Sequence, residues 1–279
     1  MIIRCWGARG SIPVSGKEFL KYGGDTTCIE IRTEKDLVVI IDAGSGIREL
    51  GKKILEEQRD KVSLLFTHAH WDHIMGFPFF RPIYREGMKI DFYGCAFSHD
   101  SLQDIISKTM VSPHFPVNFN EVKAEFSYND VCNRTFNIDS LAIATIQLSH
   151  PNQGLGYKFT ENGKTFVFIT DNELTYRHPG GLGFDDYVEF CKGADLLFHD
   201  SEYVEDEYEE KKTWGHTAYK NSVRLAIEAQ VNRFGLFHHN QNRTDDEQDE
   251  IVYDCRRILK AQNSHVECFA VYQGMEITL

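Results

Sequence analysis

The segment LLFTHAHWDHIMG constrains this chain more than any other, because an apolar strand ends there in four potential metal ligands. Alternation along an extended backbone points His68 and His70 to the same side. A turn after Trp71 then carries Asp72 and His73 to another side. Imidazoles and carboxylates bind divalent metal ions, and side by side away from water they need a compensating charge. We therefore expect this one loop to serve two adjacent metal ions rather than merely to cap a strand.

Three further candidate ligands each follow another apolar strand. His150 comes after LAIATIQLS, Asp171 after TFVFIT and His238 after RFGLF. Side chains at the carboxyl ends of strands converge on a common edge of a sheet. Because the loop supplies too few ligands to close two metal sites, these three residues are expected to complete them. His239 adjoins His238 and is the alternative ligand at that strand end.

The order of apolar patterns indicates the fold class. Short strand-like runs dominate the first third of the chain, and strands alternate with helical patterns in the last third. This order predicts an α/β fold in which two sheets lie between helices. The stretch 75–135, rich in proline and aromatic residues, is expected to be a lid-like insertion in a single domain spanning 1–279. Helices are expected near 46–58, 101–110, 216–230 and 245–262.

Composition limits the partners of the chain. It has 30 Lys and Arg against 42 Asp and Glu, a formal net charge of −12, so no overall field attracts nucleic acid or an anionic membrane. No apolar run approaches the ~18 residues of a membrane span, and the N-terminal sequence does not resemble a secretion signal. The 7 cysteines are scattered without a CxxC pair and indicate neither a disulfide framework nor a thiolate zinc site. We expect a cytoplasmic protein.

The motifs HAHWDH, SHPNQGLGY, ITDNE and LFHHN, in this order, resemble those of the metallo-β-lactamase fold superfamily of dinuclear metallohydrolases. The resemblance covers nearly the whole chain and implies an αββα sandwich of two mixed β-sheets flanked by helices. The pair Gly156 and Tyr157, and LLFHDSEY followed by WGHTAY, are similar to one branch of that superfamily. This branch contains the tRNA 3′-end endonucleases (ribonuclease Z) and small phosphodiesterases, among them cyclic nucleotide phosphodiesterases.

The resemblance also implies a ligand set for two divalent metal ions, zinc by default and manganese or iron as alternatives. The implied ligands of one ion are His68, His70 and His150. The implied ligands of the other are Asp72, His73 and His238. Asp171 would bridge the two ions. The superfamily pattern prefers His238 to His239 as the ligand.

Two residues outside the ligand set are implied to act on the substrate. By resemblance, Asp200 orients His216, and the pair contacts the phosphate or the leaving group. Asp72 is a further catalytic candidate. The endonuclease branch usually has Glu where this chain has Asp200. Because the aspartate side chain is shorter, the sequence alone does not establish that it reaches His216.

Three more residues are candidate substrate contacts. Arg9, in the glycine-rich turn WGARGSIP, could reach a phosphate or simply lie on a surface turn. His239 would contact the substrate or support a ligand if His238 binds the metal. His114 lies in SPHFPVNF, where an aromatic-rich loop could cover the metals and stack on a base.

These features favour a metal-dependent phosphodiesterase that opens 3′,5′-cyclic nucleotides to nucleoside 5′-monophosphates by attack of a metal-bridged hydroxide. The alternatives are a tRNA 3′-processing endonuclease and a hydrolase of 2′,3′-cyclic or other phosphodiesters. The net charge of −12 and the lack of a Gly/Lys/Arg-rich arm argue against extended nucleic acid as substrate. A non-catalytic metal-stabilised sensor would need a broken ligand set. Branch relatives are often homodimers, and Phe77–Tyr84 could form such a contact or pack on its own core.

Overall fold

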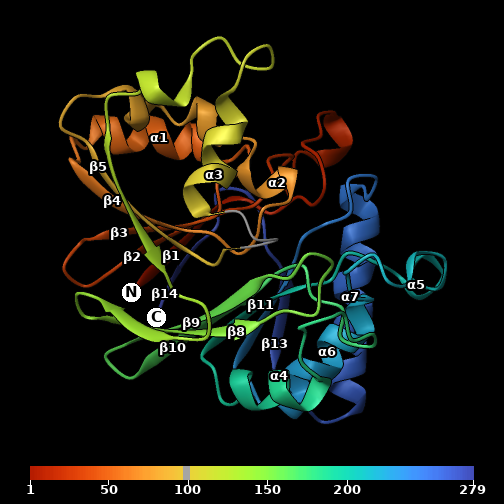
Figure 1. The fold of residues 1–279 in the computed structure, drawn as a ribbon. Helices are drawn as coiled ribbons and strands as arrows, with labels where there is room; N and C mark the ends of the chain where they lie inside the picture. The colour runs from red at the N-terminus through yellow and green to blue at the C-terminus, as the bar shows by residue number, and fades with distance from the viewer. Residues whose placement is uncertain (97–100) are drawn as a thin grey trace.

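Two mixed β-sheets pack against each other in the computed structural model, which describes residues 1–96 and 101–279 (Figure 1). The strands of the first sheet are, in spatial order, β14 (Glu276–Thr278), β1 (Ile2–Gly7), β2 (Cys28–Arg32), β3 (Val38–Ile41), β4 (Lys61–Leu65), β5 (Lys89–Gly94) and β6 (Glu125–Asp130). Neighbours from β14 to β3 are antiparallel, and neighbours from β3 to β6 are parallel.

The second sheet repeats this arrangement. Its strands are, in spatial order, β13 (Glu267–Ala270), β12 (Arg233–Phe237), β11 (Leu196–Asp200), β10 (Lys164–Ile169), β9 (Leu155–Glu161), β8 (Leu141–Gln147) and β7 (Thr135–Ile138). Neighbours from β7 to β10 are antiparallel, and neighbours from β10 to β13 are parallel. Both sheets are therefore mixed, as predicted.

Helices cover the outer faces of the two sheets (Figure 1). On the side of the first sheet lie α1 (Ile47–Glu56), α2 (Trp71–Ile74) and α3 (Leu102–Ser107). On the side of the second sheet lie α4 (Phe184–Cys191), α6 (Tyr219–Glu228) and α7 (Asp245–Ala261). Figure 1 shows α5 (Glu205–Lys211) projecting at one side. Short 3-10 helices are η1 (Lys17–Phe19), η2 (Phe77–Phe79), η3 (Arg81–Tyr84), η5 (Lys108–Met110) and η6 (Phe119–Glu121). The predicted αββα sandwich is confirmed.

Strand β10 shows how its sequence builds two cores. Successive side chains of a strand point to opposite faces. Phe166 and Phe168 accordingly lie in the core between the sheets, whereas Val167 and Ile169 lie in the core beneath α4, α6 and α7. Because both faces are covered, the strand is continuously apolar. Burial of each such side chain stabilises the fold by roughly 1.5–3 kcal/mol.

The stretch 75–135 is not the lid-like insertion that we predicted. Its segments β5 and β6 extend the first sheet, and Ile90 and Phe92 of β5 are fully buried in the core between the sheets. The prediction failed because β6 is a half-exposed edge strand, EFSYND, whose polar residues hide the strand pattern. The loop 111–118 within the stretch is mostly exposed.

Two other expectations need adjustment. The helix expected from residue 216 begins only at Tyr219, and Ala218 forms a bridge with Tyr203 instead. This leaves His216 on an irregular segment. The scattered cysteines indicate no disulfide, yet Cys95 and Cys132 form one. Cys95 directly follows β5, and Cys132 lies just after the end of β6. Because these two strands are paired, the two cysteines lie side by side.

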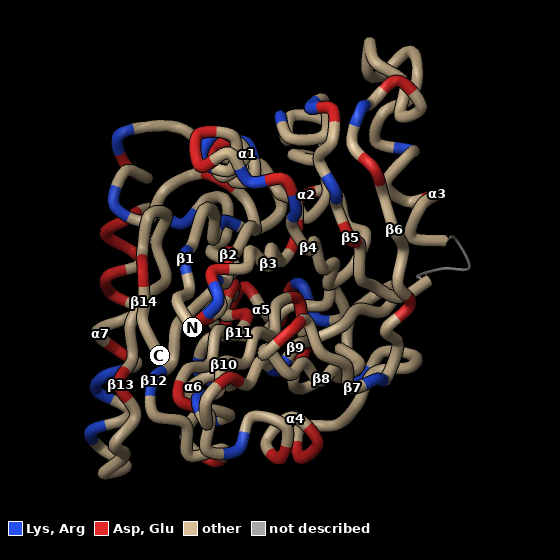
Figure 2. The backbone as a smooth tube through the Cα atoms, turned by 90° about the vertical axis from the view of Figure 1, so that its left-hand side faces the viewer, with Lys and Arg blue, Asp and Glu red and all other residues tan. Residues whose placement is uncertain are grey.

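The other five cysteines are buried and free: Cys5, Cys28, Cys191, Cys255 and Cys268. Figure 2 shows Lys and Arg scattered over the chain among Asp and Glu. Among the described residues, the helices are too short or too polar to cross a membrane.

Candidate active site

Four strand ends from the two sheets meet at one edge of the sandwich. The loop after β4 and the short helix α2 come from the first sheet and carry His68 to His73. The loops after β8, β10 and β12 come from the second sheet and carry His150, Asp171 and His238. All seven predicted ligands fall into two groups whose ligand atoms lie within 4.8 Å of one another.

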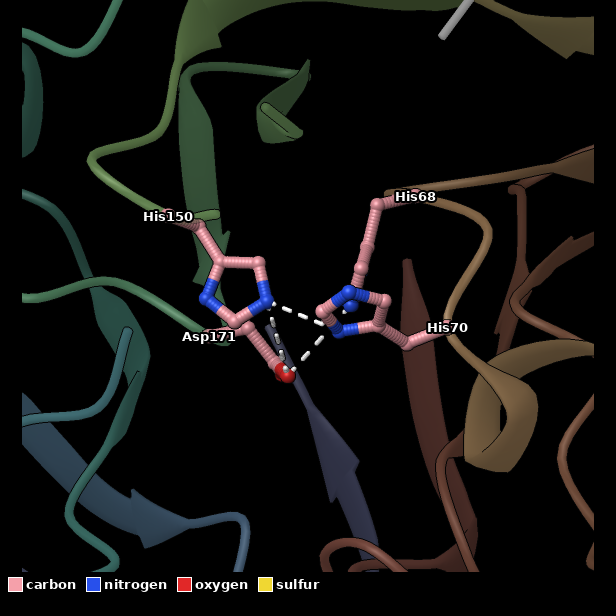
Figure 3. Close-up of side chains that lie close together, drawn as sticks. All are labelled: His68, His70, His150 and Asp171. Carbon is pink, nitrogen blue, oxygen red and sulfur yellow. Dashed lines mark hydrogen bonds and ion pairs between the residues drawn. The ribbon is translucent and has the colours of Figure 1, made fainter. Parts of the chain in front are cut away.

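The first group consists of three imidazoles around one carboxylate oxygen (Figure 3). His68 Nε2 lies 3.4 Å, and His150 Nε2 3.9 Å, from Asp171 Oδ2. His70 Nδ1 lies 2.9 Å from His150 Nε2. In Figure 3, His68 and His70 approach from one side and His150 from the other. His68 and His70 thus point the same way, as their alternation predicted.

The second group surrounds the other oxygen of the same carboxylate. Asp171 Oδ1 lies 3.2 Å from His73 Nε2 and 3.4 Å from His238 Nε2. Asp72 Oδ2 lies 3.3 Å from His73 Nε2 and 3.2 Å from His238 Nε2. The helical turn that starts at Trp71 separates Asp72 and His73 from the first group. Asp171 therefore faces both groups, one oxygen to each.

The donor set fits a pair of divalent metal ions. The Nε2 atoms of His68 and His73 are buried and have no hydrogen-bond partner within the described part of the chain. Burial lowers the pKa of His68 to about 3, so its imidazole is neutral, which is the form that binds a metal. Burial also opposes a charge on His73, but the Asp72 and Asp171 carboxylates outweigh it and raise its pKa. Buried carboxylates in this number need positive charge, which divalent cations supply.

Backbone strain at the strand ends aims the site residues. Asp42 follows β3, Asp171 follows β10 after one residue and His238 directly follows β12. All three have positive φ, at 62°, 47° and 59° respectively. Non-glycine residues rarely adopt this left-handed conformation, and where they do it often marks a functional site. The turn rotates each side chain from the strand toward the cluster.

Partners outside the two groups fix the imidazole rings. His73 Nδ1 lies 2.7 Å from Asp42 Oδ2, and His238 Nδ1 lies 3.0 Å from Glu202 Oε2. His150 Nδ1 donates to the carbonyl of Gly215 at 2.9 Å. With Nδ1 engaged, each of these rings presents Nε2 to the cluster, the arrangement typical of metal-binding histidines.

Two of these partners were not predicted. Asp42 follows the apolar strand LVVII, so the strand-end signal that found the other residues could also have found it. Glu202 lies two residues beyond Asp200 in HDSEY, and nothing in that spacing points to a histidine 36 residues away.

Glycine at two positions lets the backbone approach the ligands. A Cβ on Gly10 would lie 2.4 Å from the His238 ring, and one on Gly215 would lie 2.1 Å from His150 Nδ1.

The predicted pair of His216 and Asp200 stands beside the second group. Asp200 Oδ2 lies 2.8 Å from His216 Nδ1, so the shorter aspartate does reach the ring. The His216 and His238 rings stack at a centroid distance of 4.8 Å. Burial lowers the pKa of His216, but the Glu202 and Asp200 carboxylates outweigh it and raise the pKa to about 9. Because Nδ1 is engaged, Nε2 is the nitrogen left for a substrate.

The predicted substrate contacts do not join the site. Arg9 is 1% exposed, and its guanidinium donates to the carbonyls of Gly23, Asn240 and Arg243, so it is a structural residue. His239 is also buried, with Nε2 on the Val271 carbonyl, which makes the predictions for both residues wrong. His114 is exposed on the loop after η5, where its backbone amide donates to the Val111 carbonyl at 2.9 Å.

A comparison with known protein families agrees with this geometry. The family model described as Beta-lactamase superfamily domain matches residues 38–239. This range includes all seven predicted ligands and His216.

Individual proteins are similar to the chain over most of its length. The ribonuclease Z of Oceanobacillus iheyensis is 20% identical over 275 residues, covering 82% of this chain and 88% of that protein. Among solved structures, the metallo-beta-lactamase fold protein YhfI from Bacillus subtilis has a TM-score of 0.71 and 15% identity, covering 99% of this chain and 98% of that chain. A diphosphatase from the PhnP family has a TM-score of 0.70 and 16% identity, covering 100% and 97%. Yeast PDE1 has a TM-score of 0.70 and 13% identity, covering 100% and 99%.

Proposed function

The chain belongs to the beta-lactamase superfamily, and on that premise we propose that it is a dinuclear metal-dependent phosphodiesterase. Its proposed substrates are 3′,5′-cyclic nucleotides, which it opens to nucleoside 5′-monophosphates. The observation that carries the proposal is the Asp171 carboxylate, whose two oxygens face two separate groups of ligands. The pair of His216 and Asp200 next to these groups adds a proton donor.

The two groups divide the metal ligands between them. His68, His70 and His150 would hold one ion. Asp72, His73 and His238 would hold the other, and Asp171 would contact both. When bound, two divalent ions stabilise charge on phosphoryl oxygens and lower the pKa of a bound water toward neutrality. Zinc suits the imidazoles, and manganese or iron suits the carboxylates equally well.

His216 would act on the leaving group. The Asp200 carboxylate holds Nδ1, which leaves Nε2 as the nitrogen that can face a substrate. A protonated ring there stabilises the negative charge of the pentavalent transition state and gives its proton to the departing ribose oxygen. Asp72 accepts a hydrogen bond from the backbone of Ser11 at 2.9 Å, which fixes the carboxylate beside His238.

A tRNA 3′-processing endonuclease is the second candidate, because the relative from Oceanobacillus iheyensis is a ribonuclease Z. The charge distribution favours a small substrate instead. The chain carries a net charge of −12, and its Lys and Arg are scattered rather than gathered in one band (Figure 2). Structured RNA is bound mainly through phosphate contacts to clustered cations.

The test measures whether the protein, loaded with zinc or manganese, hydrolyses each member of a panel of candidate substrates. The panel holds 3′,5′-cyclic and 2′,3′-cyclic mononucleotides, a cyclic dinucleotide, a precursor tRNA and a chromogenic β-lactam. We expect rapid release of 5′-monophosphate from the 3′,5′-cyclic compounds. Trimming of the tRNA without hydrolysis of any cyclic nucleotide would replace the first candidate by the second.

Three further properties belong to this proposal. We expect zinc as the resident metal, a cytoplasmic location and a homodimer. Light scattering during size-exclusion chromatography tests the last of these, and a monomer at all concentrations would remove it.

A further inference from the structure

A buried carboxylate outside the ligand groups, that of Glu173, gathers an unusual number of donors. Its side chain is fully buried. Oε1 accepts hydrogen bonds from Tyr208 Oη at 2.8 Å and from the Thr213 amide at 2.9 Å. Oε2 accepts from the Gly215 amide at 3.0 Å and lies 2.8 Å from His178 Nε2. Such a carboxylate is costly to bury unless each oxygen is satisfied, as it is here.

Two of the four donors, the amides of Thr213 and Gly215, belong to the segment that leads into His216. Residues 213 to 215 directly precede His216, and the Gly215 carbonyl accepts the hydrogen bond from His150 Nδ1 at 2.9 Å. One peptide segment therefore orients a metal ligand and carries the proton donor. Glu173 holds that segment through the amides of Thr213 and Gly215.

The held segment is strained, so it needs such a support. Thr213 has φ of 78°, and Gly215 has φ of 97°. A β-branched residue with positive φ is rare and persists only where the surroundings impose it. Two amide hydrogen bonds to one buried carboxylate impose that conformation here.

Glu173 is also tied to the other ligand loops. It lies two residues after Asp171, and its own amide donates to the Ser149 carbonyl at 2.8 Å, next to His150. The segments that carry Asp171, His150 and His216 therefore all meet at this one residue. Its fourth partner, Tyr208, is the buried residue of the otherwise polar helix α5.

We propose that Glu173 is a positioning residue that sets His150 for metal binding and His216 for proton donation. It does so through the Gly215 peptide and without touching the substrate. The inference rests on the proposed function only for the role of His216. The part that concerns His150 is tested by metal affinity alone.

The test compares Glu173→Gln with Glu161→Gln. In Glu173→Gln an NH2 group replaces one carboxylate oxygen. Since one oxygen accepts from the Thr213 amide and the other from the Gly215 amide, one of these two hydrogen bonds is lost in either orientation of the side chain. Glu161 is a matched control, because it too is buried and accepts from a backbone amide, that of Glu34, at the far end of β9. Zinc affinity is measured by competition with a chromogenic chelator, together with the thermal midpoint, kcat and KM.

We expect zinc to bind Glu173→Gln about 10- to 100-fold more weakly, as for lost partners of metal-binding histidines. We expect kcat to fall while KM stays near wild type. Glu161→Gln should lower the thermal midpoint without either effect. Wild-type zinc affinity and kcat in a folded Glu173→Gln would overturn the inference.

The experiment also stays decisive if Glu173→Gln does not fold or if the wild type proves inactive. If Glu173→Gln does not fold, Tyr208→Phe removes one donor and leaves the backbone hydrogen bonds, and it should weaken zinc binding a few-fold. An unchanged affinity in Tyr208→Phe would then overturn the inference. If the wild type cleaves no phosphodiester, the proposed function fails, whereas the zinc competition still decides the role of Glu173.

Discussion

Each ring nitrogen of the site histidines has a separate task. In His73, His150 and His238 one nitrogen is held by a partner outside the cluster, and the other faces the cluster. His216 follows the same scheme with Asp200, but its second nitrogen is left for the substrate. The difference between a metal ligand and a proton donor is therefore one of placement and not of chemistry.

Replacing His216 by Ala should lower kcat about 10²- to 10⁴-fold, the usual contribution of a general acid. The loss should be far smaller with bis(p-nitrophenyl) phosphate, because its leaving group departs without a proton. Metal content should remain that of the wild type. Steady-state kinetics on both substrates, with exposed His265→Ala as the control, check this prediction. An equal loss on both substrates would argue against proton donation by His216.

Single residues also mark the limit of prediction from the sequence. The ligands could be predicted because each follows an apolar strand, and strand ends converge. Glu202 and Glu173 could not, because they act through hydrogen bonds that only the folded chain creates. Arg9 and His239 were misjudged for the same reason, since burial against backbone carbonyls leaves no trace in the local sequence.

Glycines in the loops decide how closely the elements approach the ligands. Gly215 has φ of 97° and lies against His150, whereas Gly274 has φ of 94°, and a Cβ added there would meet nothing within 4 Å. The two positions thus share a backbone conformation and differ only in their surroundings. Gly10 adds the same kind of close approach at His238.

Gly274→Ala should lower the free energy of unfolding by about 1–2 kcal/mol, the cost of a left-handed alanine, and leave activity unchanged. Gly215→Ala should cost more and should also reduce activity at least tenfold, because its Cβ would displace His150. Chemical denaturation and kinetics on both variants check this. Equal stability and full activity in Gly215→Ala would show that the loop can relax around the added methyl group.

Among elements, the continuous apolar strands were predictable, whereas the edge strands β6 and β7 were not. β10 and β12 are buried on both faces and read as apolar runs. β6 and β7 lie at the open edges of their sheets, where exposed polar residues break the pattern. The sequence pattern therefore places β6 in an insertion, although the strand extends the first sheet.

Across the sandwich as a whole, the site joins the two sheets. His68, His70 and His73 come from the first sheet, whereas His150 and His238 come from the second. Metal ions bound between them would cross-link the halves of the sandwich. Without a cation, the buried carboxylates and imidazoles at this junction must compensate one another.

Removing metal should therefore destabilise the whole fold. A ligand present at 1,000 times its Kd stabilises a protein by about 4 kcal/mol, so strong chelation should lower the thermal midpoint by roughly 8 °C or more. Added zinc should restore it. Differential scanning calorimetry checks this, and an unchanged midpoint after verified metal removal would contradict a structural role for the ions.

The number of zinc ions bound per chain decides whether the centre is dinuclear and bridged. Metal is removed from the protein with a chelator, zinc is added back, and excess zinc is removed. The zinc content per chain is then measured by inductively coupled plasma mass spectrometry, in parallel for Asp171→Asn. We predict two ions per chain for the wild type and a weakened loading of both sites in the variant, because each oxygen of Asp171 faces one site. One ion per chain, or two ions with unaltered affinity in Asp171→Asn, would contradict a dinuclear centre bridged by this carboxylate.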